Sequence, residues 1–293
     1  MVDASDGTIT WSMLWNDTAA AVGDRVRARW LCEVASGLDG DDFRAALDEP
    51  ATERMVHHLD AMLARLRDGE PPQYVLGRWG FRRLDLMVDR RVLIPRPETE
   101  QVVEVALRLA RAMPRPIAVA DLGTGSGAIG LALAAELGEL TMDGLEVWLS
   151  DASCDALDVA RANLAGLGRT GASVRIVHGD WFDALPADRR GALGLVVSNP
   201  PYVRDDDPRL ERIVREWEPG DALFGGADGL MHVRRIVADA PAWLRPGGAL
   251  VLEIGADQGV AVAALMHDAG LADVVIERDL GGHDRIARAR RPG

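Results

Sequence analysis

The sequence predicts an α/β protein in which a small helical domain precedes a doubly wound, mostly parallel sheet. Two observations predict this architecture. From residue 98 onward, short apolar segments alternate with segments of helical length, and this alternation is typical of right-handed crossovers between parallel strands. Before residue 72, apolar residues recur at helical spacing, as Met55, Leu59 and Met62 do, so no strand is expected there.

Three regions follow from these changes in pattern. Residues 1–72 form the expected helical domain, which ends at Pro71 and Pro72 because tandem prolines cannot continue a helix. Residues 73–97 alternate only weakly and are expected to be an extended connector. Residues 98–293 form the expected sheet domain.

The sheet domain opens with a helix over 98–113, after which strands and helices take turns. The last short apolar segments, which follow the helix expected over 259–269, suit a doubly wound sheet finished by an antiparallel edge strand. The expected strands cover 117–121, 145–151, 174–179, 193–198, 249–254, 274–277 and 285–288. The expected helices cover 128–137, 153–167, 229–243 and 259–269.

Composition excludes several classes of function. The 293 residues carry 46 acidic and 33 basic side chains, a net charge of −13, so neither a nucleic acid nor a membrane surface is an expected partner. All the basic residues are Arg, and this excludes a Schiff-base Lys or a P-loop Lys. The histidines lack ligand spacing and there are two cysteines, Cys32 and Cys154, so no metal site is expected.

A cytoplasmic location is expected on two grounds. Two cysteines are too few for a disulfide framework. In addition, Asp3, Asp6 and Asp17 lie where a signal peptide would have a basic start and an apolar core.

A glycine-rich turn follows the first expected strand of the sheet. Alternate glycines let the backbone approach a ligand closely, because no Cβ is in the way and positive φ is accessible. The spacing also satisfies a dinucleotide fingerprint, so the turn predicts a nucleoside-containing cofactor without choosing between the classes of such cofactors. The alternative is a purely structural role, in which the glycines let the strand pack tightly on the helix. The candidate cofactor-binding residues here are Gly123, Thr124, Gly125, Ser126 and Gly127.

Two further cofactor candidates follow the next strands. Asp151 ends the second strand, where a carboxylate can accept hydrogen bonds from both ribose hydroxyls. The alternative is that Asp151 caps the helix beginning near Ser153. Trp181 follows the third strand and offers an aromatic face to an adenine, although a tryptophan in the core is the commoner reading of such a residue.

The sequence Asn199-Pro200-Pro201-Tyr202 follows the fourth strand and carries the chemistry. Neither proline donates an N–H, and each restricts the residue before it, so the turn is rigid and presents acceptors. The Asn199 side-chain oxygen and the Pro200 carbonyl can accept hydrogen bonds from both protons of a planar amino group, while the Tyr202 ring packs against that group. An ordinary Asn-Pro turn explains neither Pro201 nor Tyr202.

The chain resembles the HemK/PrmC glutamine methyltransferases that modify peptide chain release factors. The resemblance covers nearly the whole chain, and its most specific part is Ile94-Pro95-Arg96-Pro97-Glu98-Thr99. It also includes the segment 223–226 and Leu252-Glu253-Ile254-Gly255. Asn-Pro-Pro-Tyr alone occurs in many amino-group methyltransferases.

This resemblance implies a Rossmann-like class I methyltransferase with a seven-stranded sheet. It implies S-adenosylmethionine at Gly123–Gly127, Asp151, Trp181 and Asn199, and the substrate glutamine of the Gly-Gly-Gln motif at Asn199, Pro200, Pro201 and Tyr202. Asn199, Pro200 and Tyr202 are the expected catalytic residues. The helical domain is expected to grip the release factor.

Four other functions stay open as alternatives. The same motif could methylate a glutamine of a ribosomal protein or the amino group of a nucleobase, although the charge of −13 weighs against the second. A dinucleotide-dependent oxidoreductase, or a cofactor-binding regulator without catalysis, would leave Asn199–Tyr202 unexplained.

Overall fold

The chain divides into two units in the computed structural model, which describes residues 9–139 and 143–293. The helical unit ends at Gly77, and the sheet unit runs from Arg78 to Gly293. The sequence placed its boundary after residue 72, whereas Pro72 begins a further short helix, since a proline in the first helical turn needs no N–H partner. Asp3 and Asp6 lie outside the described residues. No described helix combines the length and apolarity needed to span a membrane.

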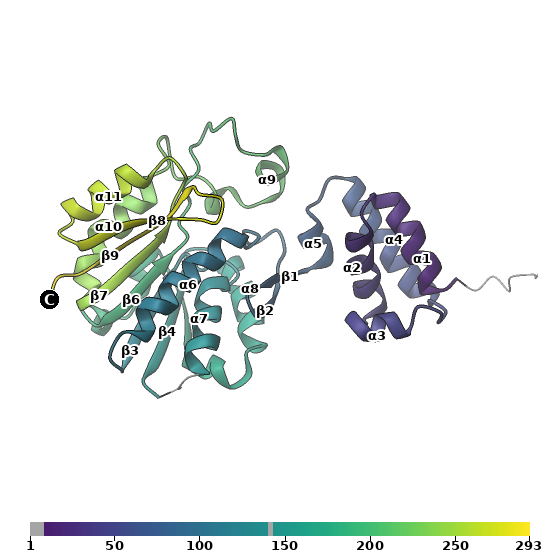
Figure 1. Cartoon of the computed structure of the whole chain (residues 1–293), viewed down its shortest axis with the longest axis horizontal. Coiled ribbons are helices and arrows are strands. Elements are labelled where there is room, and N and C mark those ends of the chain that lie inside the picture. Colours follow the sequence, from purple (N-terminus) through teal and green to yellow (C-terminus); the bar gives the residue numbers. More distant parts are fainter. Residues whose placement is uncertain (1–8, 140–142) are drawn as a thin grey trace, which may run out of the picture. The chain divides into compact units, whose positions relative to one another are not determined.

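The described part of the helical unit, residues 9–77, contains five helices (Figure 1), and their ends are set by local chemistry. The Asp24 carboxylate accepts hydrogen bonds from the N–H groups of Val26 and Arg27 and so caps the second helix. Trp11 and Phe43 meet edge to face in its core, with ring centroids 5.9 Å apart. The helices are α1 (Trp11–Val22), α2 (Arg25–Ser36), α3 (Gly40–Ala45), α4 (Glu53–Arg67) and α5 (Pro72–Leu76).

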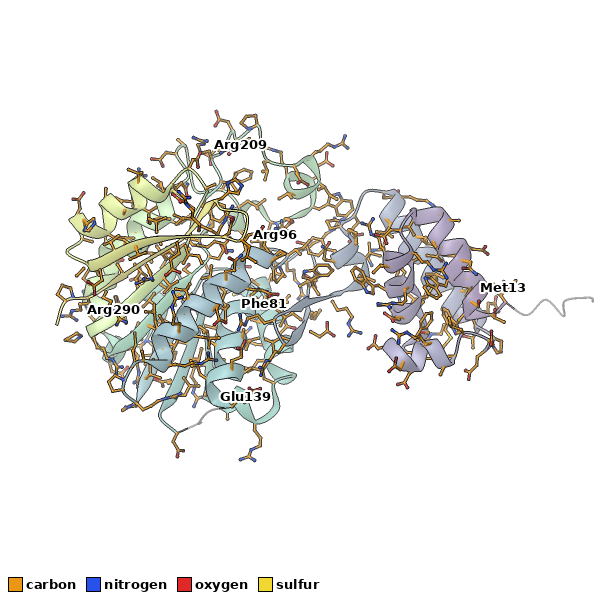
Figure 2. The ribbon with its side chains drawn as sticks, in the orientation of Figure 1. Met13, Phe81, Arg96, Glu139, Arg209 and Arg290 are labelled. Atoms are coloured by element: carbon orange, nitrogen blue, oxygen red, sulfur yellow. The ribbon has the colours of Figure 1, made fainter. Side chains whose placement is uncertain are left out.

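The sheet unit begins with an antiparallel hairpin in the region expected to be an extended connector. Its strands are β1 (Arg78–Phe81) and β2 (Leu84–Met87). Phe81, labelled in Figure 2, is buried in the same apolar core as α6 (Pro97–Arg111). The hairpin is therefore part of the sheet unit rather than a free linker.

A seven-stranded sheet forms the centre of this unit, with the order β5-β4-β3-β6-β7-β9-β8. Pairing is parallel from β5 through β7, whereas β9 is antiparallel to both of its neighbours. The strands are β3 (Ile117–Leu122), β4 (Leu145–Asp151), β5 (Val174–His178), β6 (Leu193–Ser198), β7 (Leu244–Glu253), β8 (Ala272–Arg278) and β9 (Asp284–Arg290).

The antiparallel strand is not at the edge, and this corrects the expectation from sequence. β9 lies between β7 and β8, and β8 is the edge strand. A short turn joins β8 to β9, and strands joined by so short a turn can pair only antiparallel. The sequence pattern showed both strands but not which of them would pair with β7.

Helices cover both faces of the sheet and create two apolar cores. Alternate residues of β3 separate between them, with Val119 in one core and Ala120 in the other. The first core contains α6 and α7 (Ala128–Gly138), and the second contains α10 (Met231–Trp243) and α11 (Gly259–Asp268). The other described helices are α8 (Cys154–Ala165) and α9 (Arg212–Trp217), with the short 3-10 segments η1 (Gly168–Ser173), η2 (Trp181–Ala184), η3 (Ala187–Arg189) and η4 (Gly220–Ala222).

Candidate functional site

The glycine-rich turn connects β3 to α7 at the carboxyl end of the sheet. Gly123 has φ of +67°, and a Cβ there would lie 3.0 Å from the Trp181 ring. Gly127 has φ of +87°, and a Cβ there would lie 2.7 Å from the Leu131 side chain. Both positions therefore require glycine, the first for close approach to Trp181 and the second for the start of α7.

The buried Asp121 carboxylate stabilises this turn through hydrogen bonds. Its Oδ2 accepts hydrogen bonds from the Thr124 hydroxyl at 2.6 Å and from the Gly130 N–H at 2.8 Å. Its Oδ1 has no hydrogen-bond partner in the part of the chain that the structure describes. Complete burial raises the pKa of the carboxyl to about 6, although the two hydrogen bonds oppose that rise.

This raised pKa gives a stability prediction. Because the folded pKa is about 6 against 3.8 for an unperturbed Asp, the folded state favours the protonated form. The stabilisation is full below about pH 4 and is lost as the pH rises through 6. The free energy of unfolding of wild type should therefore fall relative to that of Asp121→Asn between pH 4 and 7, by on the order of 3 kcal/mol.

Urea unfolding of both proteins across this pH range measures the difference. Asp268→Asn, at an exposed position on α11, is the control and should run parallel to wild type. Parallel profiles for Asp121→Asn and wild type would contradict the prediction.

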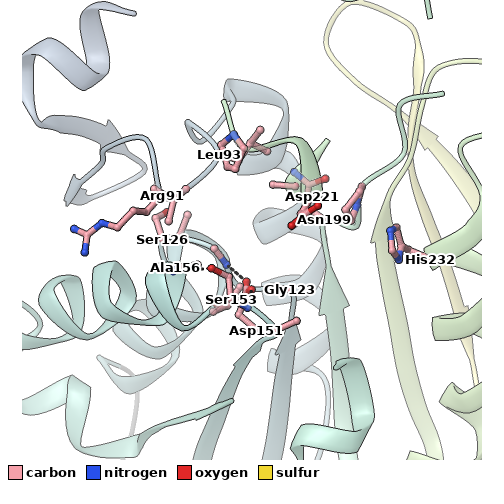
Figure 3. Close-up of a pocket in the computed structure, with 18 of the residues that line it drawn as sticks. Arg91, Leu93, Gly123, Ser126, Asp151, Ser153, Ala156, Asn199, Asp221 and His232 are labelled. Atoms are coloured by element: carbon pink, nitrogen blue, oxygen red, sulfur yellow. Dashed lines mark hydrogen bonds between the residues drawn. The ribbon is translucent and has the colours of Figure 1, made fainter. Parts of the chain in front are cut away.

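Asp151 ties the end of β4 to the glycine turn. Its Oδ2 accepts a hydrogen bond from the Gly125 N–H at 2.8 Å, and its Oδ1 accepts one from the Ser153 N–H at 2.9 Å (Figure 3). Burial raises the pKa of this carboxyl, and the backbone donors oppose the rise. The N-cap of α8 is Ser153, whose hydroxyl oxygen accepts from the Ala156 N–H, so Asp151 is not the helix cap that the sequence left open.

Trp181 begins η2 and forms an apolar wall. It has a positive φ of 49°, unusual for a residue with a large side chain. Its ring lies against Gly123 and 5.3 Å from the His232 ring, centroid to centroid, at an interplanar angle of 51°. The sequence did not single out His232, which stands one residue into α10.

The Asn-Pro-Pro-Tyr turn follows β6 and joins a buried polar network. The Asn199 Nδ2 donates to the Thr99 hydroxyl at 3.4 Å, and Thr99 in turn donates to Glu253 Oε2 at 2.6 Å. The Tyr202 hydroxyl donates to Glu253 Oε1 at 3.1 Å. Burial raises the pKa of the Glu253 carboxyl, while the Thr99 hydrogen bond and the charge of Arg285 oppose that rise. Burial and the nearby Glu253 carboxyl also raise the pKa of Tyr202.

A cavity of about 710 Å³ joins these parts, a volume within the range of small-molecule sites. Two segments far apart in sequence contribute to its lining, one with residues 91–93 and Pro95 and the other with residues 219–222. Glu218 links them, because its carboxylate accepts hydrogen bonds from the Ile94 N–H and from Arg96. Figure 3 shows Arg91, Leu93 and Asp221 around the same cavity as Asn199.

Most of the residues selected from the sequence line this cavity. They are Gly123, Thr124, Gly125, Ser126, Asp151, Trp181, Asn199 and Pro201. Gly127, Pro200 and Tyr202 are not lining residues: Gly127 caps α7, Pro200 is buried, and the Tyr202 hydroxyl is bound to Glu253. Thr99 lines the cavity and was not selected as a site residue.

Comparison with known proteins identifies the family. A release factor glutamine methyltransferase of Xylella fastidiosa (strain 9a5c) is 44% identical over 247 residues, which are 84% of this chain and 86% of the relative. Another from Cereibacter sphaeroides is 41% identical over 280 residues, 94% of each chain. This chain belongs to the release factor glutamine methyltransferase family.

Two family models match separate parts of this family member. The PrmC N-terminal domain matches residues 19–77, and the methyltransferase small domain matches residues 105–216. A crystal structure of a methyltransferase from Pyrococcus furiosus is similar with a TM-score of 0.50 and 17% identity, covering 72% of this chain and 90% of that one. This likeness shows the fold alone. The family and the fold class predicted from the sequence are both confirmed.

Proposed function

We propose that this release factor glutamine methyltransferase transfers a methyl group from S-adenosylmethionine to a glutamine side-chain amide nitrogen in peptide chain release factors. The observation that carries the proposal is the cavity in which Asn199 faces the glycine turn and Asp151. Membership of the family supports the choice of substrate. Because release factors act in translation, the proposed location is the cytoplasm. The net charge of −13 supports a protein substrate over a nucleic acid.

The cavity fits S-adenosylmethionine on three counts. Asp151 offers a buried carboxylate to ribose hydroxyls. Trp181 and His232 offer an aromatic wall to an adenine. Gly123, where a Cβ would press on Trp181, keeps the turn open. When bound, S-adenosylmethionine supplies a methyl group on a positively charged sulfur, and the lining carboxylate of Asp221 suits that charge.

The protein's task is to orient a weak nucleophile. A glutamine amide nitrogen is weak because its lone pair is delocalised into the carbonyl. In the proposed mechanism the Asn199 Oδ1 and the Pro200 carbonyl accept both amide protons and aim the nitrogen along the line of methyl transfer. These acceptors also stabilise the positive charge that develops on nitrogen during attack. The proton is lost to solvent after transfer.

Mass spectrometry of a release factor after incubation with enzyme and S-adenosylmethionine tests the proposal. One methyl group on one glutamine is the expected result, and a release factor with that glutamine replaced by alanine should gain none. Methylation of a ribosomal protein with none on the release factor would overturn the proposed substrate.

The helical unit is proposed to recognise the release factor, because the catalytic turn alone cannot distinguish one glutamine from another. A chain beginning at Arg78, the start of the sheet unit, should bind S-adenosylmethionine as wild type does. Its kcat/KM on intact release factor should fall at least about tenfold, since binding energy from remote contacts is lost. Isothermal calorimetry and steady-state methylation measure the two properties, and full activity of the shortened chain would contradict the assignment.

A further inference from the structure

A series of hydrogen bonds that begins at the wall of the cavity connects three elements of the sheet unit. Thr99 lies in the first turns of α6 and is 3% exposed, Glu253 ends β7 and is 1% exposed, and Asn199 follows β6. The hydrogen bonds run from Asn199 to Thr99 and from Thr99 to Glu253. Partners this distant in sequence meet only because the fold brings the ends of β6 and β7 to the start of α6.

The Thr99 hydroxyl fixes the direction in which these hydrogen bonds run. A hydroxyl carries one hydrogen, and Thr99 gives its hydrogen to Glu253 at 2.6 Å. Toward Asn199, therefore, Thr99 can only accept. The Asn199 amide must turn its NH2 group to Thr99, and its Oδ1, which accepts no hydrogen bond within the described residues, is left for the cavity.

We propose that Thr99 and Glu253 are positioning residues that set the amide orientation of Asn199 and so present its oxygen to the substrate. The inference rests on the proposed function, in which that oxygen accepts an amide proton. A reversed amide would present two donors to a substrate group that is itself a donor.

Glu253 sets the direction of these hydrogen bonds because its second carboxylate oxygen also accepts a hydrogen bond. Tyr202 donates to Oε1 at 3.1 Å, so both carboxylate oxygens act as acceptors. In Glu253→Gln one oxygen becomes an NH2 group. On the side of Thr99 that group donates to the hydroxyl, whose hydrogen is then free to donate to Asn199 Oδ1, and the amide reverses. On the side of Tyr202 it donates to the Tyr202 hydroxyl, and the Thr99 hydrogen bonds keep their direction.

Two substitutions at Thr99 separate the hydroxyl from the methyl group. Thr99→Ser keeps the hydroxyl and loses the methyl group, whereas Thr99→Val does the opposite. Single-turnover methyl transfer should stay close to wild type in Thr99→Ser and fall about tenfold or more in Thr99→Val, as expected when a reacting group loses its fixed orientation. Affinity for S-adenosylmethionine should change in neither. Loss of rate in Thr99→Ser with none in Thr99→Val would assign Thr99 to packing and overturn the proposal.

Glu253→Gln tests the same chain from its other end. Its rate of methyl transfer should fall by up to about 10²-fold, with kcat affected more than the KM for release factor. A wild-type kcat in both Glu253→Gln and Thr99→Val would overturn the proposal.

A cycle with Asn199→Ala decides whether Thr99 acts through Asn199. In that background Thr99→Val should reduce the rate no further, because there is no amide left to orient. Full multiplication of the two losses would contradict the proposal. Wild type, Thr99→Val, Asn199→Ala and the double variant are also unfolded in urea. The shift in urea midpoint of the double variant should be less than the sum of the shifts of the two single variants.

The urea cycle allows the positioning role of Thr99 to be tested separately from the proposed function. A wild type that does not methylate release factor counts against the proposed function, and the urea cycle then still reports whether Thr99 and Asn199 are coupled. An active wild type with additive shifts and independent rate losses counts against the positioning chain alone.

Discussion

Asn199→Ala is expected to stay folded and bind S-adenosylmethionine while losing about 10²–10³-fold in methyl transfer, the effect of removing one preorganised polar contact from a transition state. The stability cost should be small, about 1 kcal/mol. Among the described residues, the Asn199 side chain makes one hydrogen bond, to Thr99, and it is long at 3.4 Å, so its loss removes little from the folded state.

Single-turnover methyl transfer, calorimetry and urea unfolding on one preparation measure the three properties together. Asn199→Asp sharpens the comparison. Its carboxylate keeps acceptor oxygens but lacks the NH2 group that donates a hydrogen bond to the Thr99 hydroxyl. It also adds a negative charge beside the methyl donor, so binding can strengthen while the donor becomes less electrophilic. We expect impaired transfer without comparable loss of cofactor affinity. Rates near wild type in both variants would remove Asn199 from the mechanism.

The periodicity of the sequence predicted the sheet well because its strands are buried on both faces. Continuous apolar segments such as those of β3 and β6, bounded by turn residues, admit few other structures. The hairpin β1–β2 was missed, since strands of four residues leave too short an alternation to recognise. The position of β9 inside the sheet depends on pairing partners, which periodicity does not contain.

Within the site, the sequence predicted residues whose roles follow from their own strand ends. Asp151 and Asn199 stand at the carboxyl ends of β4 and β6, and parallel strands bring such ends to one edge. In the sequence, Thr99 and Glu253 stand out only as parts of family motifs. Glu253 did leave a signal, a carboxylate ending an otherwise apolar strand, but its partners lie 51 and 154 residues away. No local pattern predicts that meeting.

Asp151→Ala is expected to weaken S-adenosylmethionine binding by one to two orders of magnitude, because a lost charge-assisted hydrogen bond costs about 1.5–3 kcal/mol. The structure gives the carboxylate two tasks, which this variant removes together. One is the proposed contact with ribose hydroxyls, and the other is the pair of hydrogen bonds from Gly125 and Ser153 that shape the turn. A fall in affinity alone would therefore not identify the ribose contact.

An analogue of S-adenosylmethionine lacking the ribose hydroxyls separates these tasks. Wild type should bind it about 10- to 100-fold more weakly than S-adenosylmethionine, since the buried carboxylate then has no hydroxyl to pair with. Asp151→Ala should bind the two compounds alike, because the carboxylate that distinguished them is gone. If Asp151→Ala still discriminated between them as wild type does, the ribose would be bound elsewhere. The hydrogen bonds to Gly125 and Ser153 would then account for the whole effect of Asp151 on the site.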